Sequence, residues 1–450
     1  MNVCILGRQP ALGLAELESL YGSRVVRSAG TGAALVDADI NFDRLGGSLK
    51  AGILLTTISS TDPQRSFAWL QKNIVELTAD MEGKVKLGVS LYGLTMPTSK
   101  INANCLSLKK ALRQADRSVR VVPNTEAALS TAQTIHNNLV DERGIELLLI
   151  KSGTDTLIAR ATHVQDIEAY RKRDQQRPHR DTYVGMLPPK LAQIIINLAS
   201  GIQEPQTSTE GITNVPVRPK TASATSGDDS FSADSDFPSE RSKTKKPLAL
   251  SESAEKDVGA RSGPQTEDMP PPTLLDPFCG TGVILQEAAL MGYRVYGTDL
   301  NETMVRYSHD NLKWLEETRS IRIDTHYETV DAADHVWRQP IDIVACEGYL
   351  GHPFSEEPDS KALKATMQTC DVVMKKFLRN IHAQLTPGTR LCVAVPAWHV
   401  AGRVHHLPML PTIESMGYRR VAFSAAPSSD LLYYREGQVV ARELLVLIKP

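Results

Sequence analysis

The stretch TLLDPFCGTG, residues 273–282, combines residue types that could perform chemistry. Apolar residues suited to a β-strand lead into Asp276, and Gly280 and Gly282 follow with one residue between them. Glycine lets a ligand approach the backbone closely, because no Cβ intervenes. In an open parallel sheet, ligands bind beyond the carboxyl ends of the strands. We therefore expect a ligand-binding loop at the end of this strand.

Two further acids stand at the ends of the next expected strands. Asp299 ends YRVYGTD, where it suits ribose hydroxyls, and Asp331 follows the third strand, where it could accept from an adenine amino group. The loop lacks the third glycine of a dinucleotide fingerprint and the Gly-Lys-Ser/Thr ending of a phosphate loop. An acid directly before the glycines would repel a pyrophosphate but favour a cation. S-adenosylmethionine fits these requirements, because it carries a sulfonium, an ammonium and a ribose. The alternative is that the three acids only cap turns and bind no ligand. The residues predicted to bind this cofactor are Asp276, Phe278, Gly280, Gly282, Asp299, Leu300, Asp331 and Ala332.

DPFCGTG resembles the first motif of the class I methyltransferases that modify exocyclic amines of bases. Nearly the whole chain resembles the THUMP-domain tRNA guanine-N2 methyltransferases of the position-10 guanosine type. ILGRQPALGLAELESLYG, KVKLGVSLYG and GMLPPKLAQIIINLA carry this second likeness. The resemblance implies S-adenosylmethionine as cofactor and tRNA as partner, with the THUMP domain gripping the acceptor end. The sequence carries no signal for or against a small activator subunit.

The chain departs from that family after the fourth expected strand, IDIVAC. An Asp/Asn-Pro-Pro-Tyr box is expected there, but the chain reads Glu347-Gly348-Tyr349-Leu350. In that box the acid or amide accepts hydrogens of the target amine while the aromatic ring stacks on the base. Glu347 keeps an acceptor, so we predict catalytic roles for Glu347 and Tyr349, with Phe354 as a second aromatic group. The alternatives are a non-catalytic tRNA-binding protein with a vestigial fold, and a nucleotide-dependent oxidoreductase, which the missing third glycine disfavours.

Strands and helices alternate after residue 272, which predicts a parallel sheet covered on both faces. The predicted fold class is α/β, with a class I, Rossmann-like methyltransferase sheet preceded by an α+β region. A helix is expected over 125–144, and a long helix over much of 359–385. The predicted domains are a ferredoxin-like α+β region (1–60), a THUMP-like RNA-binding domain (61–170), a connector with the entry helix (171–203), a disordered insertion (204–272) and the methyltransferase domain (273–450).

Two segments outside these domains differ in composition from the rest. Residues 204–272 are rich in Ser, Thr, Pro, Gly and charge, so they cannot bury enough apolar surface to offset the entropy of ordering. The connector RKRDQQRPHRD is basic and is either a phosphate-contacting segment or a solvated hinge. Its candidate RNA-binding residues are Arg171, Lys172, Arg173, Arg177 and Arg180.

The overall composition narrows the remaining possibilities. A net charge of −2 gives no sign of a nucleic-acid partner, although a local basic patch would suffice for one. The six cysteines form no close pair at metal-ligand spacing, which favours a reducing compartment and argues against disulfides and a metal site. No signal peptide or membrane span is visible, so we expect a cytoplasmic protein without membrane contact.

Overall fold

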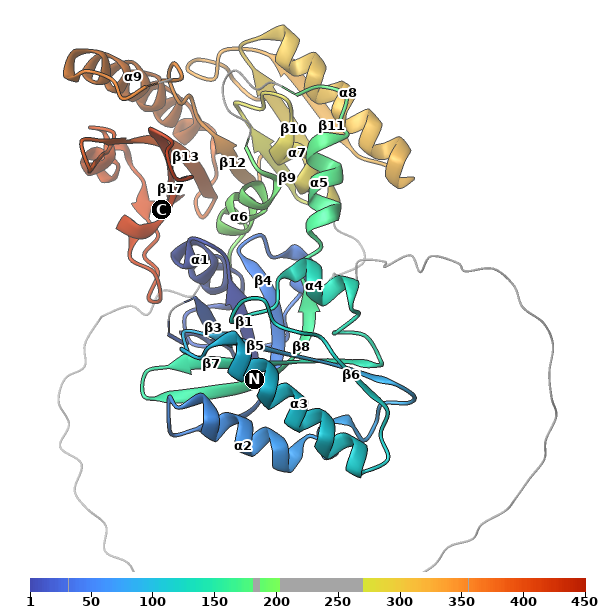
Figure 1. Cartoon of the computed structure of the whole chain (residues 1–450). Coiled ribbons are helices and arrows are strands. Elements are labelled where there is room, and N and C mark those ends of the chain that lie inside the picture. The colour runs from blue at the N-terminus through green and yellow to red at the C-terminus, as the bar shows by residue number, and fades with distance from the viewer. Residues whose placement is uncertain (31, 181–186, 203–269, 355) are drawn as a thin grey trace, which may run out of the picture. The chain divides into compact units, whose positions relative to one another are not determined.

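The computed structural model describes residues 1–30, 32–180, 187–202, 270–354 and 356–450. The predicted insertion at 204–272 therefore lies almost entirely outside the described residues. The described parts of 1–204 and 271–450 form one compact unit that contains two β-sheets (Figure 1). Among the described helices, none combines the length and the apolar character that a membrane span requires.

The first sheet has eight strands in the order β2-β3-β1-β4-β8-β7-β5-β6. Strands from both predicted N-terminal regions share it, because β4 pairs with β8 along an antiparallel ladder. Its elements are β1 (Asn2–Leu6), α1 (Pro10–Tyr21), β2 (Val26–Ser28), β3 (Ala33–Val36), β4 (Ser48–Ile58), α2 (Pro63–Asn73), β5 (Val85–Tyr92), α3 (Thr98–Gln114), β6 (Val119–Val121), α4 (Thr131–His136), β7 (Gly144–Ser152) and β8 (Asp155–Val164).

Helix α4 is much shorter than the helix expected over 125–144, and that prediction was wrong. Ser130 Oγ accepts from the Gln133 backbone nitrogen at 3.1 Å, and Gln133 Oε1 accepts from the Ser130 nitrogen at 3.0 Å. This reciprocal capping box starts the helix at Thr131. After His136 the chain turns, and Asn138 takes a left-handed conformation with φ of +52°. Local side-chain hydrogen bonds therefore decide the boundary.

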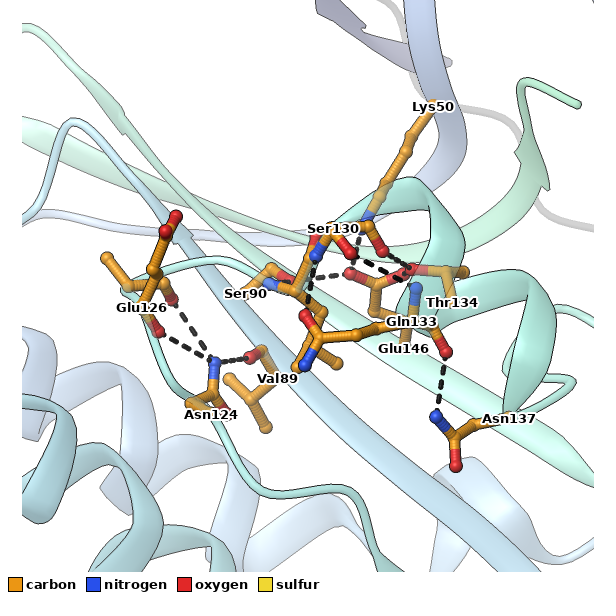
Figure 2. A network of polar contacts seen from close by, with 12 residues as sticks. Lys50, Val89, Ser90, Asn124, Glu126, Ser130, Gln133, Thr134, Asn137 and Glu146 are labelled. Atoms are coloured by element: carbon orange, nitrogen blue, oxygen red, sulfur yellow. Dashed lines mark hydrogen bonds and ion pairs between the residues drawn. The ribbon is translucent and has the colours of Figure 1, made fainter. Parts of the chain in front are cut away.

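A buried ion pair joins strands of the first sheet (Figure 2). Lys50 of β4 donates to Glu146 of β7, and their side chains are 2% and 0% exposed. Glu146 also accepts from Ser90 Oγ at 2.5 Å and from Thr134 Oγ1 at 2.8 Å. Lys50 Nζ donates a second hydrogen bond to the Leu129 carbonyl at 2.9 Å. The network ties α4 and the segment before it to the sheet.

The second sheet has the order β11-β10-β9-β12-β13-β17-β15, with β14 and β16 at its side. Neighbours from β11 to β13 are parallel and β17 is antiparallel, so the strand order reverses between β9 and β12. This arrangement confirms the predicted class I methyltransferase fold. The elements from the connector onward are α5 (Ile167–Gln175), α6 (Pro189–Ala199), β9 (Thr273–Asp276), α7 (Val283–Leu290), β10 (Arg294–Asp299), α8 (Glu302–Arg319), β11 (Thr325–Thr329), β12 (Ile343–Glu347), α9 (Ser360–Gln384), β13 (Arg390–Val400), β14 (Arg403–His405), β15 (Arg419–Arg420), β16 (Leu432–Tyr433) and β17 (Val440–Ile448).

Two apolar cores cover the two faces of the second sheet. On one face α6 is almost wholly buried and shares a core with α1 and α7. On the other face α9 packs Met374, Phe377 and Leu378 against β12, β13 and β17. All six cysteines are buried and free. The carboxyl ends of the parallel strands are thereby held rigidly side by side.

Candidate active site

The loop after β9 leaves room for a ligand beside its glycines. Gly280 and Gly282 have φ of +50° and +79°, a conformation that favours glycine. A Cβ on Gly282 would come within 2.8 Å of Ser308 Oγ, so this position is closely packed. A Cβ on Gly280 would meet only the Phe278 carbonyl oxygen, at 4.0 Å. The open space at Gly280 is the kind of cradle that a cofactor occupies.

Asp299 ties this loop to the end of β10. Its Oδ2 accepts from the Gly280 nitrogen at 3.0 Å, and its Oδ1 accepts from the Asn301 nitrogen at 2.9 Å. Burial raises the pKa of the carboxyl. A carboxylate offers about four acceptor sites, so roughly two remain for ligand hydroxyls. Asp299 therefore fits the predicted ribose contact.

Asp276 lies deepest in the site and is 2% exposed. Its Oδ1 accepts from the Phe278 nitrogen at 3.2 Å. Burial raises its pKa well above the usual range, and the charges of Asp299 and Glu347 raise it further. Three neighbouring carboxyl groups give this edge of the sheet a negative potential. A cationic ligand such as a sulfonium or an ammonium would offset that potential, so the residues present fit S-adenosylmethionine.

Glu347 ends β12, on the other side of the point where strand order reverses, and forms an ion pair with Arg442 of β17. The Arg442 Nε donates to Glu347 Oε1, and the two side chains are 8% and 17% exposed. Burial raises the pKa of Glu347, while the Arg442 guanidinium lowers it. Glu347 is therefore an acceptor whose position is set by a strand 95 residues further along the chain.

The loop after Glu347 differs from the box that the resemblance leads one to expect. Leu350, at the expected aromatic position, is buried, with 5% of its surface exposed. Tyr349 and Phe354 are half-buried and pack at the edge of the core beneath α9. Burial raises the pKa of the Tyr349 hydroxyl. Tyr349 and Phe354 are thus the aromatic rings that this loop could present to a base.

The other predicted cofactor residues flank the strand ends. Leu300, directly after Asp299, is 72% exposed. Asp331 Oδ1 accepts from the Ala333 nitrogen at 2.9 Å, and the Ala332 carbonyl accepts from Asn380 at 3.1 Å. The ring of Phe278 meets Phe377 edge-on, at 5.0 Å between centroids. Leu300 presents exposed apolar surface of the kind that an adenine ring could cover.

The five basic residues of the connector fall into two groups. Arg173 donates to both carboxylate oxygens of the buried Glu287, at 2.8 and 3.1 Å. The Arg177 side chain is 1% exposed and forms an ion pair with Asp174 at 3.5 Å. Arg171, Lys172 and Arg180 are exposed, although Arg171 also pairs with Glu168. Only these three exposed cations are placed where they could contact RNA without first losing a buried partner.

Arg442 is the site residue that sequence reasoning missed. It lies in the strand sequence VARELLVLI, where Arg442 and Glu443 interrupt an otherwise apolar run. Both are buried and paired, Arg442 with Glu347 and Glu443 with His406. Charged residues in a buried strand require such partners. The signal was therefore present, but the identity of the partner depends on the pairing of β13 with β17.

Comparisons with known proteins agree with this geometry. Residues 272–418 match the family described as "Methyltransferase domain". A tRNA (guanine(10)-N2)-dimethyltransferase of Methanothermobacter thermautotrophicus is 31% identical over 123 residues, which are 27% of this chain and 32% of that protein. A Pyrococcus abyssi protein of the same name is 54% identical over 41 residues, 9% of this chain and 12% of that protein. The solved structure of TrmN from Thermus thermophilus matches at 15% identity with a TM-score of 0.46, covering 100% of this chain and 99% of that one.

The chain spans a third or less of the length of these two curated relatives. Residues 272–418 nevertheless form a methyltransferase domain, because the family match and the strand order agree. The predicted resemblance to tRNA guanine-N2 methyltransferases is confirmed. For this domain, the predicted enzyme class and the prediction of S-adenosylmethionine as methyl donor are confirmed as well.

Proposed function

We propose that this chain methylates the N2 amino group of a guanosine in tRNA, of the position-10 type, with S-adenosylmethionine as methyl donor. The observation that carries the proposal is the placement of Asp276, Asp299 and Glu347 at the ends of three adjacent strands, beside an open glycine loop. The relatives named above act on the guanosine at position 10, which supports the choice of atom and position. A cytoplasmic location agrees with a tRNA substrate and stays a prediction.

The cofactor, when bound, supplies an electrophilic methyl group, and the residues of the loop supply its binding site. Asp299 accepts from ribose hydroxyls while it holds the Gly280 nitrogen. Burial raises the pKa of Asp276, and a bound cation would favour its ionised form, whose charge then stabilises that cation. Together these residues would hold the cofactor at the carboxyl edge, where orientation of its methyl donor lowers the barrier to transfer.

Glu347 is the proposed acceptor for the hydrogens of the target amine. A guanine amino nitrogen is a weak nucleophile, because its lone pair is delocalised into the ring. A carboxylate that accepts the amino hydrogens stabilises the charge that develops during transfer. Arg442 holds the carboxylate at the strand end and opposes the rise in the pKa of Glu347 that burial causes. Tyr349 and Phe354 are proposed to pack against the extruded base.

Methyl transfer to tRNA by Glu347 and Asp299 variants tests both halves of this proposal. Glu347→Ala should lower the rate about a hundredfold or more, since one transition-state hydrogen-bond partner is lost, and Glu347→Gln should fall between wild type and Ala. Cofactor affinity should change much less in these two variants than in Asp299→Ala, because Glu347 is held toward Arg442 on the other side of β12. Asp299→Ala should instead weaken S-adenosylmethionine binding by ~1.5–3 kcal/mol, the range for a charge-assisted hydrogen bond.

The control is Asp324→Ala, which removes an exposed carboxylate from the amino-terminal side of β11, where it pairs with Arg294. That variant should match wild type in both measurements. Nucleoside mass spectrometry of the tRNA product identifies the modified base and position. If wild type binds tRNA but transfers no methyl group to it, the chain is the non-catalytic tRNA-binding protein, and the Glu347 and Arg442 pair serves stability alone.

A further inference from the structure

Helix α9 carries a row of positively charged side chains on its exposed face. None of these side chains has a role in the proposed reaction. The helix is 25 residues long and buries one side against the second sheet. At 100° per residue, its cationic side chains all fall within an arc of about 120° on the other side. These side chains, here called the α9 face, are Lys361, Lys364, Lys375, Lys376 and Arg379.

Among the described residues, most cations of the α9 face have no ion-pair partner. Asp371 is the one acid in the helix, and it is 7% exposed. It pairs with Lys375 at 2.7 Å and accepts from the Met409 nitrogen. In the part of the chain that the structure describes, the other four cations have no ion-pair partner. Cations that repel one another along one helix face indicate an anionic partner.

Helix α8 shows what an exposed helix of this domain looks like without such a surplus. Its eighteen residues carry four acids and three lysines or arginines. Exposed residues of both signs alternate along it, for example Glu302, Arg306, Lys313 and Glu317. A solvated face therefore has mixed charge in this protein, which sets the α9 face apart.

The position of the α9 face links it to the candidate active site. Twelve residues separate Glu347, which ends β12, from the start of α9 at Ser360, and the helix leads back to the start of β13. Because β12 and β13 are parallel, the helix must run from the carboxyl edge of the sheet toward the opposite edge. Of the acids that precede it, Glu357 and Asp359 accept backbone hydrogens of Ala401 and Ala362. From Lys361 to Arg379 the row extends about 27 Å at 1.5 Å per residue.

We propose that the α9 face binds the phosphate backbone of the tRNA whose base enters the site at Glu347. The inference rests on the proposed function for the identity of the RNA, and on the unbalanced charge for the contact with phosphates. A row of separate lysines and arginines suits successive phosphates, which carry no sequence information. The α9 face would then set the direction in which the tRNA leaves the catalytic domain.

The salt dependence of tRNA binding tests this surface. The variant Lys364→Gln/Lys376→Gln/Arg379→Gln removes three charges, so the slope of log affinity against log salt should fall by roughly two units. The matched control, Arg306→Gln/Lys313→Gln/Arg319→Gln, removes three charges from α8 and should keep the wild-type slope. Lys364→Arg/Lys376→Arg should also keep it, because the charge is retained. S-adenosylmethionine affinity reports whether each variant is folded.

Two measurements separate this inference from the proposed function. The α9 variant should raise KM for tRNA severalfold and leave kcat at saturating tRNA unchanged, since no altered residue lies at a strand end. If its salt slope equals that of the α8 variant, the α9 face does not bind tRNA, whether or not the enzyme methylates. If wild type transfers no methyl group but the salt slope still falls in the α9 variant, the α9 face binds tRNA and the proposed methylation is wrong.

Discussion

Each of the two sheets contains a glutamate paired with a cation, and the two pairs differ in their surroundings. In the first sheet Glu146 accepts from Lys50, Ser90 and Thr134, and its side chain is fully buried (Figure 2). In the second sheet Glu347 pairs with Arg442 at the open carboxyl end of β12 and keeps 17% of its side-chain surface exposed. A carboxylate whose acceptor sites are taken by the protein can only stabilise the fold. One held from one side at a strand end can still bind a substrate.

The Lys50 pair is the place to expect the largest effect on stability. Lys50→Met should lower the free energy of unfolding by about 3–5 kcal/mol, because it leaves the Glu146 carboxylate uncompensated in a buried site. Urea denaturation measures this loss. Lys50→Met/Glu146→Gln should recover most of it, since the glutamine is neutral: its amide oxygen can accept from one of the two hydroxyls, Ser90 or Thr134, and its amide nitrogen can donate to the other. If the single and double variants lose equal free energy of unfolding, the loss comes from the changed shape of the side chain and not from the uncompensated charge.

The Arg442 pair should respond in the opposite way, with a larger effect on rate than on stability. Arg442→Met should slow methyl transfer about ten- to a hundredfold while cofactor affinity is kept, because Glu347 loses the group that positions it. Water at the strand end can solvate the exposed part of the carboxylate, so the loss of stability should be smaller than for Lys50→Met. Steady-state kinetics and urea denaturation of both variants make the comparison.

A pH profile distinguishes positioning from a structural role for Arg442. Burial raises the pKa of Glu347 and the guanidinium lowers it. Removing the cation leaves burial unopposed, so the pKa rises and the ionised acceptor is lost at a higher pH. The part of the acidic limb that Glu347 contributes should therefore move to higher pH in Arg442→Met, and be absent in Glu347→Gln/Arg442→Met. If the limb stays in place, Arg442 does not act through Glu347.

The difference between the two ion pairs also shows which features of the site could be predicted from the sequence. Asp276, Asp299 and Glu347 were predicted as strand-end acids, because each follows an apolar run that is long enough for a strand. The ion pairs were not predicted, since the partners of Glu347, Glu146 and Arg173 come from strands and helices far away in sequence. These partners are Arg442, Lys50 and Glu287, respectively. Local patterns thus located the acids, whereas the pairing of distant strands decides which acids are neutralised.

Helix boundaries follow the same division. The bounds of α8 and α9 agree with their apolar periodicity, because burial on the sheet determines where each helix lies. Helix α4 was predicted six residues too early, since the Ser130 and Gln133 capping box outweighs the helix-forming residues before it. A search for capping boxes in the sequence would have corrected that start.

A further buried glutamate, Glu16, sharpens the comparison. Glu16 is 0% exposed. Its carboxylate accepts from the backbone nitrogens of Gly46 and Gly47 and from the side-chain amide of Asn197, at 2.7 to 2.9 Å. Burial raises its pKa to about 7 from an ordinary value of 4.5. The folded protein therefore holds a proton that the unfolded chain releases between these two values. The contribution of protonated Glu16 to the free energy of unfolding is therefore fully present below pH 4.5. It is lost as pH rises toward 7, at up to about 1.4 kcal/mol per pH unit.

Urea denaturation from pH 4.5 to 8 measures this dependence as the difference between wild type and Glu16→Gln. The variant should be less stable throughout, because the glutamine amide faces N–H donors, but its stability should vary less with pH over that range. If the Glu16→Gln curve runs parallel to wild type instead, the three N–H donors keep Glu16 ionised as effectively as a cation would. A buried carboxylate in this fold would then need no opposite charge, and the distinction drawn between the two sheets would rest on exposure alone.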